Sequence, residues 1–106
     1  MDTKLTITRK NNLMVGTINH SDRLNATIAP EIKDQLNNQL NKSDVSFVLD
    51  LQNIRFIDST GIAVLISALK TARQNNRTFY LANIQKEVKD LLALMKLDKV
   101  FDYFEE

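Results

Sequence analysis

Two apolar runs joined by a short polar turn constrain the fold of this chain more than any other feature. The first, Phe-Val-Leu-Asp-Leu at residues 47–51, is short and almost continuously apolar, which indicates a buried strand. The second starts with Ile-Ala-Val-Leu-Ile at residues 62–66 and is longer, which favours a helix. Asp-Ser-Thr-Gly at residues 58–61 separates them. The sequence therefore predicts a buried strand, a polar turn and a helix in succession.

The polar turn carries side chains that suit the start of a helix. Asp58, Ser59 and Thr60 can accept hydrogen bonds from the free N–H groups of a first helical turn. That end of a helix also carries partial positive charge and favours an anion. A phosphoryl group on Ser59 would suit the fold while adding roughly −1.5 to −2 charges to the surface. The local chemistry leaves two interpretations open, an ordinary helix cap and a modification site.

Size and charge limit the classes of function. The 106 residues are enough for one domain, residues 1–106, with a single core and no disulfide or metal. Hydrophobic residues at 43% and charged residues at 25% are ordinary for a globular protein. The 14 basic and 13 acidic side chains give a net charge of +1, and the basic residues are scattered along the chain. We therefore expect no nucleic-acid partner and no membrane partner.

The chain lacks the side chains of common catalytic sites. It has no cysteine and one histidine, His20, which excludes thiol catalysis, histidine clusters and the usual nucleophile–base pairs. We expect no catalytic residue, no metal site and no cofactor. No apolar run reaches the roughly 18 residues that span a bilayer, and the first six residues alternate rather than form a signal-peptide core. These features predict a cytoplasmic protein that is not an enzyme.

The N-terminal third predicts a hairpin and an amphipathic helix. Residues 4–9 alternate and predict a half-buried strand with Leu5 and Ile7 inward, and residues 13–18 return after an Asn-Asn turn as its antiparallel partner. A polar segment then precedes a helix with Pro30 in its first turn. Its apolar stripe recurs every four residues: Ile28, Ile32, Leu36 and Leu40. Residues 41–44 are the predicted loop into a central strand, residues 45–51.

The second half predicts two more helices and another strand. The helix after the polar turn extends to about residue 75, and a buried strand at 78–82 follows through a parallel crossover. A third helix ends near Lys96. Its predicted inward residues are Val88, Leu91, Leu92 and Met95. Residues 97–104 fit either a short strand or a last helical turn.

The order β-β-α-β-α-β-α predicts an α/β fold. It gives a mixed β-sheet, with a parallel centre and an N-terminal hairpin, and helices packed on the sheet. The polar turn at residues 58–61 would lie at the C-terminal end of a central strand, where open α/β sheets usually build sites. This position favours a functional role for Ser59.

Three parts of the chain resemble the STAS domain family, named for sulfate transporters and anti-sigma factor antagonists. They are residues 21–32, residues 48–51 with 57–62, and residues 88–97 with 100–101. The first resembles the loop and helix start after the first hairpin, the second the central strand and phosphorylation loop, and the third the last helix and its exit. Asp-Ser-Thr-Gly is the specific part, because it marks stand-alone bacterial members that are phosphorylated on the serine.

The resemblance implies a partner switch. In the family, the unphosphorylated domain binds an anti-sigma factor that is also a serine kinase, and so frees the sigma factor. The kinase uses ATP to phosphorylate the serine, here Ser59, and a PP2C-type phosphatase restores the first state. The protein itself then needs no cofactor, and we expect a monomer or weak dimer. The implied partner-binding residues are Asp58, Ser59, Thr60, Gly61, Asp22, Arg23 and Asn25.

The chain departs from the family pattern at several positions. Members commonly have aspartate where Asn25 stands and glycine near Asp22, and glycine is common at the position of Lys96. Ile62 and Ala63 follow the motif where leucine and glycine are frequent. With Asn25, a carboxylate that family members carry close to the phosphorylation loop is missing or moved. The change at Lys96 affects only a helix end.

Other roles remain open beside the partner switch. A STAS subunit of a membrane lipid transporter would have no phosphorylation cycle, although the intact Asp-Ser-Thr-Gly argues against it. Small-ligand binding at the sheet end rests on fold analogy alone. Asp58 is either a structural cap or a residue that positions the serine or the metal of the kinase, and Gly61 is expected to leave room for a closely approaching partner.

Overall fold

The computed structural model describes residues 4–42 and 45–105 and contains the predicted alternation of strands and helices. In chain order the elements are β1 (Leu5–Lys10), β2 (Leu13–Ile18), β3 (Arg23–Leu24), α1 (Ala29–Lys42), β4 (Ser46–Asp50), β5 (Phe56–Ile57), α2 (Ser59–Gln74), β6 (Phe79–Ala82), α3 (Lys86–Leu94) and β7 (Asp102–Tyr103). Two residues of the predicted loop 41–44 belong to α1, and the other two, 43 and 44, lie outside the described residues.

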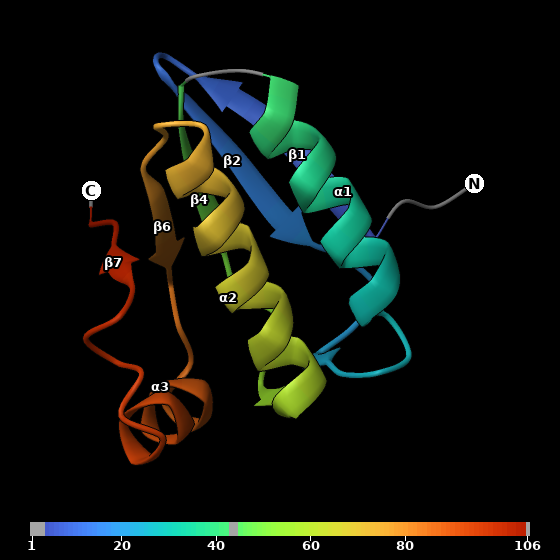
Figure 1. Ribbon diagram of the computed structural model, residues 1–106. Coiled ribbons are helices and arrows are strands. Elements are labelled where there is room, and N and C mark those ends of the chain that lie inside the picture. The colour runs from blue at the N-terminus through green and yellow to red at the C-terminus, as the bar shows by residue number, and fades with distance from the viewer. Residues whose placement is uncertain (1–3, 43–44, 106) are drawn as a thin grey trace.

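A five-stranded mixed sheet has the order β1-β2-β4-β6-β7 (Figure 1). Strands β1 and β2 form an antiparallel hairpin, with Leu5 opposite Ile18. All the other pairs in this sheet, β2 with β4, β4 with β6 and β6 with β7, are parallel. The structure therefore confirms the predicted N-terminal hairpin and parallel centre, and β4 is the central strand.

Helices α1 and α2 lie next to each other over one face of the sheet, and both begin at the same end of the molecule (Figure 1). The predicted apolar stripe is confirmed, because Ile28, directly before α1, and Ile32, Leu36 and Leu40 within α1 are all buried. They share one core with apolar side chains of α2 and of the central strands. Burial of this face, more than the helix propensity of an asparagine-rich sequence, holds α1 in place.

Arg77 is a charged residue buried in the core, with 5% of its surface exposed. Its Nε donates to the Val45 carbonyl at 2.6 Å and its Nη1 to the Gln39 carbonyl at 2.6 Å. The guanidinium also lies 5.9 Å from the centre of the Phe47 ring. Arg77 thus joins the C-terminal part of α1 to the start of β4, and satisfies carbonyl groups that would otherwise need water.

The C-terminal segment differs in part from the prediction. Val88 and Leu92 of α3 are buried as expected, but Met95 is 46% exposed, because the helix ends at Leu94 and Met95 already has a cap conformation. Lys96 then takes a left-handed φ of 59°, and the next N–H bonds back to the Leu92 carbonyl at 2.8 Å. A residue that ends a helix in this left-handed conformation is usually glycine. Lys96 thus stands at a helix end, as the family pattern indicated. The tail forms a strand, β7, beside β6.

A second small sheet, formed by β3 and β5, was not predicted. The two strands pair in parallel, Arg23 opposite Phe56 and Leu24 opposite Ile57. The polar turn therefore follows β5 in the small sheet and not the central strand β4, which corrects its expected position. Two residues are too short to show an alternating pattern, so the pairing depends on contacts between distant parts of the chain.

Candidate functional site

The start of α2 is held by Asp58, which is its N-cap residue. Asp58 has extended backbone angles, and its Oδ1 accepts the Gly61 N–H at 3.0 Å. The same oxygen accepts the Thr60 hydroxyl at 2.5 Å. This geometry confirms the cap role of Asp58 that the sequence left as one of two alternatives.

The hydrogen bonds at the cap lower the pKa of the Asp58 carboxyl. The Thr60 hydroxyl is the largest cause and the Gly61 N–H the next, while desolvation opposes them. The backbone N–H groups of Thr60 and Ala26 also favour the ionised form. Asp58 is therefore an anion at neutral pH that receives donors both from its own helix and from the loop before α1.

We predict that the cap contribution of Asp58 is lost in acid. Because the folded pKa is lowered, the contribution is complete above the unfolded value of about 3.9 and is lost as the pH falls through the folded value. Asp58→Asn keeps an acceptor oxygen but does not titrate. The stability advantage of the wild type over Asp58→Asn, measured by urea unfolding across this range, should shrink in acid. A difference that does not change with pH would contradict the prediction.

Ser59 and Thr60 differ in what their hydroxyl groups do. Both residues are exposed, but the Thr60 hydroxyl is engaged with Asp58. Within residues 4–42 and 45–105, the Ser59 hydroxyl makes no hydrogen bond. Ser59 is also the first residue of α2. Its hydroxyl is therefore accessible at the positive end of a helix.

Gly61 is buried, and packing within the protein explains why a residue without a side chain stands there. A Cβ atom at this position would overlap the Leu24 carbonyl oxygen and lie 2.6 Å from Cγ1 of Ile57. The first turn of α2 thus packs directly against the backbone of the small sheet. The sequence predicts that Gly61 leaves room for a closely approaching partner, whereas in the structure the protein itself fills the space beside this glycine.

The loop with Asp22, Arg23 and Asn25 lies against the segment that leads to the polar turn. The Asp22 carbonyl accepts the N–H groups of Arg55 at 2.8 Å and Phe56 at 3.1 Å. The Leu24 carbonyl faces the Asp58 N–H at 3.4 Å. The structure therefore brings together the two groups of residues named from the sequence, although more than thirty positions separate them in the chain.

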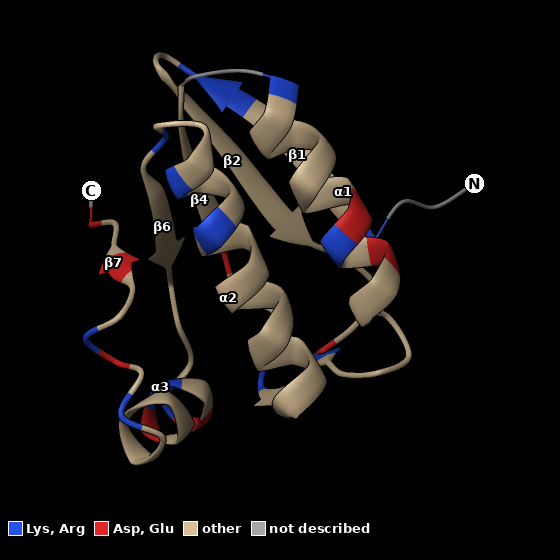
Figure 2. Ribbon diagram, in the orientation of Figure 1, with Lys and Arg blue, Asp and Glu red and all other residues tan. Residues whose placement is uncertain are grey.

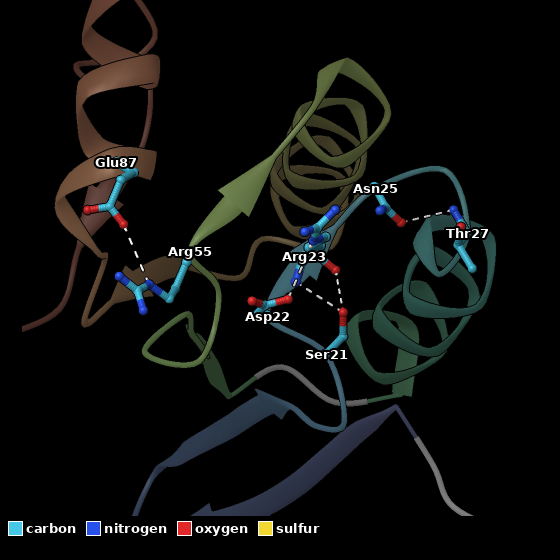
Figure 3. A network of polar contacts seen from close by, with 7 residues as sticks. All are labelled: Ser21, Asp22, Arg23, Asn25, Thr27, Arg55 and Glu87. Atoms are coloured by element: carbon cyan, nitrogen blue, oxygen red, sulfur yellow. Dashed lines mark hydrogen bonds and ion pairs between the residues drawn. The ribbon is translucent and has the colours of Figure 1, made fainter.

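Side-chain contacts shape this loop further (Figure 3). The Ser21 hydroxyl accepts the Arg23 N–H at 3.0 Å and donates to the Arg23 carbonyl at 2.8 Å, and Arg23 Nε lies 3.7 Å from the Asp22 carboxylate. Asn25 Oδ1 accepts the Thr27 N–H at 3.1 Å. An aspartate oxygen could accept the same N–H. Asparagine in place of the family's aspartate at position 25 therefore keeps the local turn and removes only the negative charge.

Phe56 and Arg55 belong to this surface but were not identified from the sequence. Phe56 is 52% exposed, and the Arg23 guanidinium lies 5.1 Å from the centre of its ring. Arg55 Nε is 3.8 Å from the Glu87 carboxylate of α3 (Figure 3). The pairing of β3 with β5 makes Arg23 and Phe56 neighbours. The sequence holds one signal for them: Phe56, an aromatic residue, follows Arg55 directly and stands just before the polar turn.

In the view of Figure 2, the blue segments of Lys and Arg predominate at the end of the molecule where α1 and α2 end, and blue and red segments are mixed at the opposite end. Across the described ranges, no three histidine, aspartate or glutamate residues form a cluster that could hold a metal ion. None of the helices in those ranges is long and apolar enough to cross a membrane.

Comparisons with known proteins agree on one family. The STAS domain model matches residues 5–106. The anti-sigma-B factor antagonist of Staphylococcus epidermidis is 24% identical over 94 residues, which cover 81% of this chain and 87% of the relative. An anti-sigma-factor antagonist (STAS) domain protein from Planctomyces limnophilus has a TM-score of 0.87 at 17% identity, covering 96% of this chain and 90% of the other. A point variant of RsbS from Moorella thermoacetica has a TM-score of 0.78 at 19% identity, covering 97% and 87%.

Proposed function

The chain belongs to the STAS domain family, and on this premise we propose that it is an anti-sigma factor antagonist controlled by phosphorylation of Ser59. The unphosphorylated form binds an anti-sigma factor that is also a serine kinase, which releases the sigma factor. The kinase transfers a phosphoryl group from ATP to Ser59, the complex dissociates, and a PP2C-type phosphatase reverses the modification. The protein is a regulator that uses no cofactor of its own. The name of the Staphylococcus epidermidis relative supports the general role.

The hydroxyl of Ser59, which has no hydrogen-bond partner among the described residues, is the observation that carries this proposal. A kinase needs an exposed acceptor that is not already committed, and Ser59 meets both conditions. The neighbouring Thr60 fails the second, because its hydroxyl bonds to the cap carboxylate. The structure thus supplies a reason to prefer Ser59 over Thr60 that does not depend on the family resemblance.

The phosphate would act on the interface rather than on the fold. At the first position of α2 it lies at the positive helix end, so the modified domain stays folded. It also stands beside the anionic Asp58 on a surface that the kinase must cover. Desolvation and like-charge contact at such an interface weaken binding strongly. Release therefore requires no refolding.

The loop with Asp22, Arg23 and Asn25 is the second part of the proposed partner surface. It packs against the segment before the polar turn, so a kinase positioned over Ser59 also contacts this loop. The exposed pair of Phe56 and Arg23 extends the surface with an aromatic and an arginine side chain, residue types that are enriched at protein interfaces.

The proposal is tested by incubating the protein with the purified anti-sigma factor kinase of its source organism and Mg-ATP, followed by peptide mass spectrometry. We expect one phosphoryl group, on Ser59, and its removal by the PP2C-type phosphatase. Ser59→Ala should abolish the modification, and Thr60→Ala should retain it. A phosphate on another residue, or none on the wild type, would refute the switch. Copurification with a transporter ATPase, without phosphorylation, would instead favour a transporter subunit.

A further inference from the structure

A groove between α1 and α2 opens beside the polar turn. Its volume is about 420 Å³, which exceeds that of any single side chain. The floor includes Ala29 and Val64, both buried, and the exposed walls include Ala26, Pro30 and Ala63. Thr60 and Lys33 supply its polar atoms. We call this hollow the α1–α2 groove. Its lining is mostly apolar, and its small side chains leave it unfilled.

The groove is continuous with the proposed phosphorylation site. Thr60, which lines it, directly follows Ser59, and Ala63 stands four residues after Ser59 on α2. Residues four apart share one face of a helix. Both helices begin at this end of the molecule (Figure 1). A protein that places a phosphoryl donor over the Ser59 hydroxyl therefore also covers the groove.

The charge at the groove limits what can occupy it. Lys33 is exposed at its edge, and its ammonium forms no ion pair within the described ranges. The rest of the lining is apolar except for the Thr60 hydroxyl. A complementary segment has apolar side chains for the walls and floor and a carboxylate for Lys33.

We infer that the α1–α2 groove is the anchoring site for the kinase, and that it receives an apolar segment of the kinase flanked by an acidic residue. This inference rests on the proposed function and adds a specificity surface to it. The groove holds the kinase in the correct position over Ser59. The Ser59 side chain itself contributes little to the affinity before it is phosphorylated. Binding then depends on Ala63 and Lys33, neither of which takes part in the phosphoryl transfer.

The test uses two pairs of matched variants of the full chain. Ala63→Arg fills the groove, and Ala93→Arg makes the same change at an exposed alanine of α3. Lys33→Glu reverses the charge at the groove, and Lys89→Glu does so at an exposed lysine of α3. Affinity for the purified kinase is measured by calorimetry, Ser59 phosphorylation by mass spectrometry, and folding by circular dichroism.

We expect Ala63→Arg to weaken kinase binding by about tenfold or more, and Lys33→Glu by about threefold or more with a reduced salt dependence. The two α3 variants should bind like the wild type. If the wild type binds and is phosphorylated while Ala63→Arg and Lys33→Glu bind equally well, the groove is not the anchoring site and the proposed function stands. If the wild type neither binds nor accepts phosphate, the proposed function fails and this inference with it.

Discussion

Replacing Gly61 by alanine should destabilise the protein by about 2 kcal/mol or more, because a Cβ atom has no room there. It would overlap the Leu24 carbonyl oxygen, and a backbone atom of a paired strand cannot move aside as a flexible side chain can. The gain in helix propensity from glycine to alanine, about 1 kcal/mol, is too small to compensate. Urea unfolding followed by circular dichroism measures the loss.

The other glycine of the chain provides the control. Gly16 lies in β2, and a Cβ atom there would meet the edge of the Phe47 ring at 2.8 Å. Gly16→Ala makes the same chemical change against a side chain, so we expect a smaller loss, of about 1 kcal/mol. If Gly61→Ala were as stable as the wild type, or more stable than Gly16→Ala, the close packing of α2 on the small sheet would be contradicted.

Ser59→Asp should weaken binding to the kinase by about hundredfold or more, because it places a second carboxylate beside Asp58 at the proposed interface. The fold should tolerate the change, since an acidic residue in the first turn of a helix adds about 0.3–1 kcal/mol of stability. Affinity and stability should therefore change in opposite directions. Calorimetry of the complex and thermal unfolding of the free protein measure the two effects.

Two variants separate the charge from other effects of the substitution. Ser59→Asn has nearly the shape of Ser59→Asp without the charge, so it should retain most of the affinity. Gln74→Glu adds a negative charge at the far end of α2, about 20 Å away, and should bind like the wild type. Equal losses for Ser59→Asp and Ser59→Asn would show that shape, and not charge, disrupts the complex.

Elements with a repeating pattern were predictable from the sequence. The alternation at residues 4–9, the four-residue spacing from Ile28 to Leu40 and the apolar run at 47–51 each predict an element that the structure contains. The cap at Asp58 was also predictable, because a capping side chain bonds to residues within one helical turn of it. Met95 was placed wrongly because the pattern does not show where α3 ends.

The geometry of the site was decided by the tertiary structure. The sequence pattern did not reveal that Leu24 pairs with Ile57, that the Gly61 backbone packs against Leu24, or that α1 and α2 leave a groove open. The sequence named Ser59 through a family resemblance, and the fold added the engaged hydroxyl of Thr60.

The physical reason for this division is the range over which each feature acts. Strand and helix periodicity and helix capping act between residues a few positions apart, so the order of side chains in the sequence determined them. Strand pairs of two residues and grooves between helices depend on contacts between segments far apart in the chain. Only the packed fold brings these segments together, and for that reason the tertiary structure alone decided the surroundings of the polar turn.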